Sequence, residues 1–244
     1  MNDIEVATFI AALPATRWGR RRGVVEIPDG EHVFDAPVLI AEPVEIRGFG
    51  NSSITVSGDF AAFHILHEAT DTAIRNLSIR SVTAGVGVGI EVQAGRCIFD
   101  DLGFYDMAIG INAAPLTVPN DFADQVYNTD GIAVRDSEFA GCTIGLNLAG
   151  GECSTGVVQS CRFTNCATCV FQSTKFGNTF LGCDCEGAGT GFDSALAQAN
   201  DQSTYVGCFV ELQAVVVNPH TLVVGGGMTS YVTGCERVGG FVTA

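Results

Sequence analysis

The chain has 244 residues, of which 12 are basic and 27 are acidic, and its formal net charge is −15. This balance argues against nucleic acid and anionic membranes as partners, because both attract basic surfaces. A membrane span needs roughly 18 consecutive apolar residues, and the sequence has no such run. The hydrophobic fraction of 47% is too high for a disordered chain, and the 30 glycines with many valines favour β structure over a helical bundle.

The first residues, Met1 to Glu5, are acidic, whereas a secretory signal begins with basic and then apolar residues. We therefore expect a cytoplasmic or phage-borne protein without a secretory signal. In that setting the 10 cysteines are expected to be free, reduced and buried, as small apolar side chains.

Residues 1–22 are predicted to form an N-terminal cap. Residues 3–13 have the pattern of a short amphipathic helix that ends at Pro14. Such a helix covers the open end of a solenoid. The cluster of Arg17, Arg20, Arg21 and Arg22 that follows is interpreted as a solvated edge or a partner for the acidic body, and an anion site is the alternative.

A repeated pattern begins at residue 23 and continues to about residue 240. Its clearest spacing is marked by residues 77, 102, 137, 161, 183, 208 and 235, in steps of 25, 35, 24, 22, 25 and 27. Each repeat contains two apolar strands, room for a third short strand, and glycine-rich corners. Three short strands in this length form one coil of a parallel β-solenoid. We therefore expect an all-β domain over residues 23–244 with about eight to ten coils.

Equivalent positions of the repeats define inward columns. One column contains Cys161, Cys183, Cys208 and Cys235, a second contains Phe104, Phe139 and Phe163 and continues with Cys185, and a third contains Cys142 and Cys166. The columns also account for cysteine spacings that resemble zinc motifs, so no metal site and no cofactor is predicted. His64 and His67 lie three apart in a predicted strand, where they point to opposite faces and cannot chelate one ion.

Two segments resemble a known family. Gly23-Val24-Val25-Glu26-Ile27-Pro28-Asp29-Gly30 and Val44-Glu45-Ile46-Arg47-Gly48-Phe49-Gly50 resemble the opening coils of the pectin/pectate-lyase-like β-helix superfamily. The resemblance implies a single-stranded right-handed parallel β-helix. It says little about function, because the superfamily includes lyases, hydrolases, epimerases, phage tail proteins and inert members.

The stretch Asn128-Thr129-Asp130-Gly131 resembles a polygalacturonase motif whose aspartate takes part in acid–base catalysis. The later motifs of that family are absent, since the place of its adjacent aspartate pair is taken by Gly145-Leu146-Asn147-Leu148. A tight turn is the alternative interpretation of the stretch.

Alternation along the first strand of each repeat predicts an outward acidic patch. The residues predicted to be catalytic are Asp101, Tyr105, Asp136, Glu138 and Arg162. Asp101 and Asp136 would form the acid–base pair, Arg162 would stabilise negative charge, and Tyr105 would relay a proton or stack on a sugar. An insertion at about residues 115–130 is expected to roof this patch, and the predicted substrate-binding residues are Asp124, Tyr127, Asp130 and Asp184.

Three functions fit these features. The first is an enzyme with carboxylate chemistry, a hydrolase, lyase or isomerase that acts on a glycan or a sugar-like ligand. The second is a non-catalytic structural or adhesive module of the phage-tail type, assembled as a homotrimer. The third is an intracellular cyclase or isomerase that uses a small molecule and the same scaffold.

Overall fold

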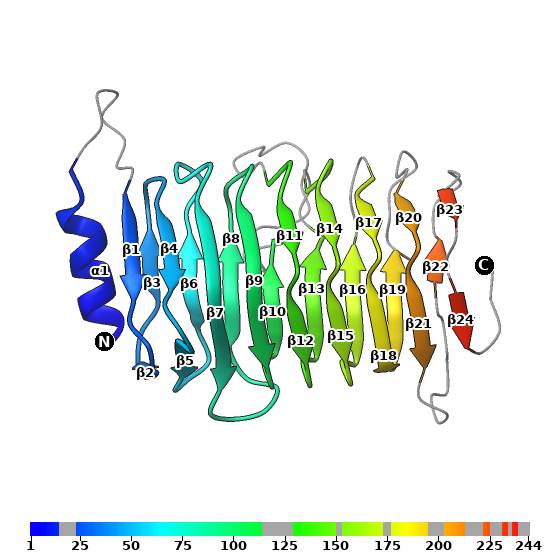
Figure 1. The fold of residues 1–244 in the computed structure, drawn as a ribbon, viewed down its shortest axis with the longest axis horizontal. Helices are drawn as coiled ribbons and strands as arrows, with labels where there is room; N and C mark the ends of the chain where they lie inside the picture. The colour runs from blue at the N-terminus through cyan, green and yellow to red at the C-terminus, as the bar shows by residue number, and fades with distance from the viewer. Residues whose placement is uncertain are drawn as a thin grey trace.

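The computed structural model describes residues 1–14, 23–113, 129–149, 153–172, 177–194, 203–212, 222–224, 231–233 and 236–238. These residues form an elongated parallel β-solenoid with one helix, α1 (Asp3–Ala12), at its N-terminal end (Figure 1). The prediction of an all-β solenoid with an N-terminal capping helix is confirmed. Among the described residues, no helix is long and apolar enough to cross a membrane.

Among the described residues, two parallel sheets form the walls of the solenoid. The first sheet has 16 strands: β1 (Val24–Ile27), β2 (Glu31–Phe34), β4 (Glu45–Gly48), β5 (Ser53–Val56), β7 (Ala73–Ser81), β9 (Ile98–Tyr105), β11 (Ala133–Arg135), β12 (Glu138–Ala140), β14 (Val157–Gln159), β15 (Arg162–Thr164), β17 (Thr179–Leu181), β18 (Asp184–Ala188), β20 (Thr204–Val206), β21 (Phe209–Leu212), β23 (Tyr231–Thr233) and β24 (Glu236–Val238). The second has eight: β3 (Val38–Ile40), β6 (Ala61–Ile65), β8 (Val88–Val92), β10 (Ile109–Asn112), β13 (Ile144–Leu148), β16 (Thr168–Gln172), β19 (Thr190–Ser194) and β22 (Leu222–Val224).

Each coil contributes two consecutive segments to the first sheet and one strand to the second. The long strands β7 and β9 run through both segments, and in later coils the same path is split, as in β11 and β12. Every strand pairs in parallel with the equivalent strand of the next coil. Equivalent residues are therefore about 4.8 Å apart along the axis.

The coils turn at residues with left-handed backbone conformation. Between the two segments of the first sheet this corner has φ values of 54° at Asn76, 54° at Asp101, 47° at Asp136 and 52° at Ser160. Gly182 and Gly207 continue the same column with φ of 57° and 61°. Asn, Asp and Gly adopt this conformation most readily. The corner therefore explains why these residue types recur at the start of each repeat.

The residue that follows the corner has a small side chain, which points inward and bonds the backbone of the preceding coil. Cys161, Cys183 and Cys208 point inward and donate their thiols to backbone carbonyls of the preceding coil, at 3.6, 3.5 and 3.7 Å. All nine cysteines in the described residues are free and buried, as expected from the sequence. Cys235, the last member of the predicted column, lies outside the described residues.

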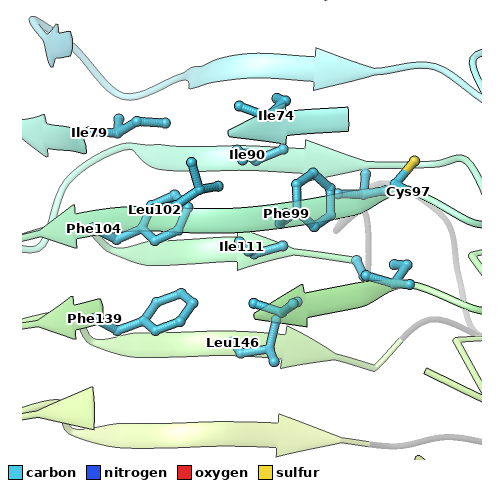
Figure 2. Packing of buried hydrophobic residues seen from close by; sticks show 14 of the residues in the cluster. Ile74, Ile79, Ile90, Cys97, Phe99, Leu102, Phe104, Ile111, Phe139 and Leu146 are labelled. Atoms are coloured by element: carbon cyan, nitrogen blue, oxygen red, sulfur yellow. The ribbon is translucent and has the colours of Figure 1, made fainter. Parts of the chain in front are cut away.

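The aromatic column is packed against a column of glycines. Phe104 and Phe139 stack with ring centroids 4.9 Å apart (Figure 2). Phe139 and Phe163 stack at 4.7 Å. A Cβ atom on Gly110 would lie 2.6 Å from the ring of Phe139, and Gly145 is related to Phe163 in the same way. One coil later, Cys185 replaces the phenylalanine in register with Phe163. The glycines of the second sheet are thus required by the rings of the first.

The helix α1 seals the N-terminal end of this core. Val6 and Ile10 are buried in the main hydrophobic cluster, while Asn2 and Glu5 form a reciprocal capping box. The helix packs beside β1 and β3, the first strands of the two sheets.

The buried thiols predict a loss of stability at alkaline pH. Burial raises the pKa of Cys97, Cys153 and Cys161 to about 12. The folded state therefore holds these protons after the unfolded chain has released them, and the stabilisation present below pH 9 is lost between pH 9 and 12. Each thiol should lower the free energy of unfolding by about 1.4 kcal/mol per pH unit in that range. Urea unfolding followed by circular dichroism at pH 8, 9.5 and 10.5 measures the slope. Cys97→Ala should reduce it, and a flat profile would contradict the assignment.

The contact between glycine and aromatic columns gives a second prediction. Gly110→Ala places a methyl group against both the ring of Phe139 and a backbone carbonyl, so it should destabilise the fold by about 1–3 kcal/mol. The single variant Phe139→Leu should also destabilise the fold, because it reduces the buried apolar area. In the double variant the two costs should be less than additive, because the smaller side chain makes room for the methyl group. Strict additivity in chemical denaturation would show that the two residues are not in close contact.

Candidate functional site

A groove lies outside the corner between the two segments of the first sheet. Its volume is about 630 Å³, and it crosses five successive coils. The lining residues are Gly50, Asn51, Ser52, Asn76, Leu77, Ser78, Asp101, Leu102, Gly103, Tyr105, Asp136, Ser137, Glu138, Ser160 and Arg162. With about 4.8 Å between coils, the groove extends for about 19 Å along the axis.

Asp101 and Asp136 occupy equivalent corner positions on adjacent coils. Their neighbours Asp100 and Arg135 are register partners, as are Gly103 and Glu138. The left-handed corner by itself favours aspartate or asparagine. The backbone therefore brings two carboxylates together in the groove.

The ring of Tyr105 lies on the groove surface over Gly103, which has no side chain. A Cβ atom on Gly103 would lie 2.7 Å from ring atom Cε2 of Tyr105 and 2.8 Å from its hydroxyl oxygen. The ring therefore covers the glycine, and its hydroxyl donates to Oε2 of Glu138 at 2.9 Å. The guanidinium carbon of Arg80 lies 5.9 Å from the ring centroid, within the range of a cation–π contact.

The Tyr105 phenol remains protonated in this environment. Partial burial, followed by the hydrogen bond and the negative charge of Glu138, raises the pKa of Tyr105. The neutral phenol can therefore act as a hydrogen-bond donor at physiological pH. The Tyr105 hydroxyl donates its hydrogen bond to Glu138, and this bond fixes the orientation of both side chains.

Arg162 is the cation of the groove, and it is neutralised by carboxylates from the next coil. Its Nη2 donates to Glu186 at 2.7 Å, and its Nε lies 3.9 Å from Asp184. The bond to Glu186, with the charges of Glu186, Asp184 and Glu138, raises the pKa of Arg162. Burial and the neighbouring charge of Glu186 raise the pKa of Asp184. Glu138, Arg162 and Asp184 thus form a line of alternating charge on register partners of three coils.

The structure places the five residues predicted to be catalytic, Asp101, Tyr105, Asp136, Glu138 and Arg162, in this one groove. Asp184, predicted to bind substrate, is the register partner of Arg162 and lies outside the groove lining. Asp124 and Tyr127 lie outside the described residues.

Asp130, also predicted to bind substrate, lies outside the groove lining. Asp130 precedes β11, whereas the groove follows β11, so a whole strand separates the two corners. The Oδ1 of Asp130 accepts the backbone N–H of Ser154 on the next coil at 2.9 Å, and its carbonyl accepts the N–H of Arg96 at 2.8 Å. This part of the polygalacturonase-like stretch therefore serves as a corner that joins neighbouring coils.

Several groove residues are not singled out by the sequence. Asn51, Ser52 and Ser137 line the groove. Asn51 is at the corner position of its coil, and Ser52 and Ser137 are at the position that follows the corner. The Ser52 and Ser137 hydroxyls donate to backbone carbonyls, at 2.8 Å to Ile27 and 2.6 Å to Arg135. The sequence could have indicated them by their place in the repeat, because they occupy the same repeat positions as the corner residues and the corner cysteines. Among the described residues, no group of three or more His, Cys, Asp and Glu side chains could hold a metal ion.

Comparison with known proteins shows similarity to solved structures only. No protein-family model and no curated protein matches the sequence. The chain is similar to the Acinetobacter phage vB_ApiP_P1 tailspike protein, with 12% identity and a TM-score of 0.46 over 89% of this chain and 47% of that one. It is also similar to Geobacillus virus E2 ORF18, with 12% identity and a TM-score of 0.46 over 99% of this chain and 58% of that one. The chain thus spans about half the length of each protein. Membership of the pectin/pectate-lyase-like superfamily stays a prediction.

The position of Tyr105 can be tested through Gly103. Gly103→Ala should leave the fold intact, because alanine suits a strand better than glycine and the side chain that must move is the half-buried ring of Tyr105. The methyl group should displace the ring and break the hydrogen bond to Glu138. NMR of ¹³C-labelled tyrosine, assigned with Tyr105→Phe, should then show a changed Tyr105 signal at neutral pH. An unchanged signal would mean that the ring does not lie over Gly103.

Proposed function

We propose that this chain is an adhesive, non-catalytic β-solenoid whose groove binds a polyhydroxylated ligand such as a glycan chain. The observation that carries the proposal is the groove itself, which is open, about 19 Å long, and lined by hydroxyl, amide and carboxylate groups from five coils. A sugar hydroxyl both donates and accepts hydrogen bonds, so it matches such a mixed lining. The tyrosine ring adds an amphipathic surface.

The groove favours an extended ligand that runs along the solenoid axis. Equivalent positions recur about every 4.8 Å, and the lining changes along this direction. The N-terminal part presents Asn51, Asn76 and Ser78, whereas the carboxylates and Arg162 lie in the later coils. A neutral part of the ligand fits the first region, and a part with additional donors fits the second.

The contacts of the polar groups favour binding over catalysis. A glycosidase needs one carboxyl group that gives its proton to the leaving oxygen and a second that attacks or activates water. Glu138 is occupied by the Tyr105 hydroxyl, and Arg162 by Glu186. The corner conformation accounts for the residue type at Asp101 and Asp136 without an acid–base role.

Hydrolysis of the bound glycan is the second candidate function, and the Asp101–Asp136 pair favours it. Equivalent positions on adjacent coils are about 4.8 Å apart, which is close to the carboxyl separation of about 5 Å in retaining glycosidases. A neutral Tyr105 could relay a proton in such a site.

The adhesive interpretation includes a role as part of a phage tail, which is one of the alternatives that the sequence raises. Assembly as a homotrimer stays a prediction, and light scattering of the purified protein measures it directly. A trimer would bring three copies of the groove into one particle and raise the avidity for a repetitive surface.

Binding is tested by screening the protein against a glycan array and measuring the best hit by calorimetry. Asp136→Asn keeps a residue type that tolerates the left-handed corner, and Glu138→Gln keeps the size of the side chain. Each should weaken binding about 10- to 100-fold, because a hydrogen bond to a charged group contributes roughly 1.5–3 kcal/mol. The amount of reducing ends should not increase on prolonged incubation.

Glu68→Gln, an exposed carboxylate outside the groove, is the control and should bind like the parent protein. Binding that survives both groove variants would place the ligand elsewhere. Release of reducing ends that is abolished by Asp136→Asn would replace the adhesive function with hydrolysis.

A further inference from the structure

The groove carries more negative than positive charge. Its lining contains one cation, Arg162, and three carboxylates, those of Asp101, Asp136 and Glu138. The cation is already paired, since its Nη2 donates to Glu186 of the next coil at 2.7 Å. A ligand in the groove therefore meets a surplus of negative charge, which disfavours glycans that carry carboxylate or sulfate groups.

Asp101 and Asp136 are the unpaired carboxylates of the lining. Their corner positions lie on adjacent coils, with backbones about 4.8 Å apart, and both side chains are exposed to solvent. Among the described residues, neither carboxylate has a hydrogen bond or an ion pair, whereas Glu138 accepts the Tyr105 hydroxyl at 2.9 Å. Two neighbouring carboxylates repel each other, and a cation bound between them removes that repulsion.

An ammonium group suits this pair better than a metal ion does. It has three N–H donors, so it can bond both carboxylates at once and keep one donor for a third acceptor. A calcium ion takes roughly six to eight oxygen ligands. In the part of the chain that the structure describes, no group of three or more His, Cys, Asp and Glu side chains could hold such an ion. The two carboxylates therefore match a singly charged organic cation.

The surface beside the pair fits one sugar ring. Gly103 follows Asp101 by two strand positions, about 7 Å along the strand, and the Tyr105 ring that covers it offers a flat amphipathic surface. The neighbour of Gly103 on the preceding coil is the neutral Ser78. Arg80, the register partner of Tyr105, lies about 13 Å along the strand from the corner column. A sugar on this ring can therefore direct an amino group toward the corner, away from that cation.

We propose that the ligand of the groove is a glycan with a free amino group, bound as an ammonium between Asp101 and Asp136 while its sugar ring lies on Tyr105. This inference rests on the proposed function, because it names the class of glycan that the same groove binds. N-acetylation of the amine removes the charge and two of the three donors, so the pair of carboxylates discriminates against acetylated sugars. The groove thus selects the sign of the charge on its ligand.

The probe is the β-1,4-linked tetramer of glucosamine, titrated into the full chain by calorimetry at pH 6 and physiological ionic strength. It should bind at least 10-fold more tightly than its N-acetylated form, and the tetramer of galacturonic acid should not bind. Raising the pH to 8.5 neutralises the amine and should remove the preference. Equal affinity for the acetylated tetramer, or no binding of the amine form at millimolar concentration, would overturn the inference.

Variants separate this site from diffuse attraction to an acidic chain. Asp101→Asn and Asp136→Asn keep a residue type that suits the left-handed corner, and each should weaken binding of the glucosamine tetramer at least 10-fold, with circular dichroism to verify the fold. Asp106→Asn is the matched control, because Asp106 is exposed, has a similar backbone conformation with φ of 58°, and lies outside the groove lining. An equal loss in this control would show unspecific attraction. Pentalysine that binds as tightly, with the same dependence on Asp136, would replace the glycan with a basic peptide.

Failure of this inference and failure of the proposed function give different results. If a neutral or N-acetylated glycan binds, Glu138→Gln weakens it and a free amine gives no advantage, the adhesive function stands and the inference is wrong. If no glycan of either kind binds to the chain, the adhesive function is wrong as well.

Discussion

The left-handed corner is the constraint on which the rest of the solenoid depends. A coil closes only if the backbone turns sharply at the same place in every repeat, and a single residue with positive φ makes that turn between the two segments of the first sheet. The corner fixes the register of the strands on both sides. It also determines which residue types are tolerated, from Asn76 and Asp101 to Gly182 and Gly207.

The interior follows from this register. Because each corner is directly above the last, the next inward position is also stacked, and it is filled by small side chains that donate to a carbonyl at the turn, such as Cys161 and Cys183. Further along, the stacked rings of Phe139 and Phe163 require glycines on the opposite wall. The abundance of glycine and cysteine in this chain is thus a consequence of packing between coils.

The exterior follows from the same repetition. Outward positions are also stacked, so like side chains meet across coils unless the sequence alternates their charge. The line of Glu138, Arg162 and Asp184 alternates in this way. Stacking does not pair every polar atom, since among the described residues the buried Oδ1 of Asn147 on the second sheet has no hydrogen-bond partner. The groove is the part of this exterior where the repeat gathers hydroxyl, amide and carboxylate groups from five coils.

The sequence alone determined the repeat, the inward columns and the residues that share the outer side of the corner. Because coils stack with a fixed period, residues one repeat apart in the sequence become neighbours on adjacent coils. For that reason the spacing by itself places Asp101, Asp136, Glu138 and Arg162 together. Only the tertiary structure decided that the Tyr105 ring lies over Gly103, because a side-chain direction depends on free space that no spacing reports. The structure also decided that Asp130 belongs to another corner, since the length of β11 separates positions that are only six residues apart in the chain. The unpaired carbonyl of Asn147 had no signal in the sequence, because hydrogen-bond satisfaction is a property of the folded neighbours and not of residue type.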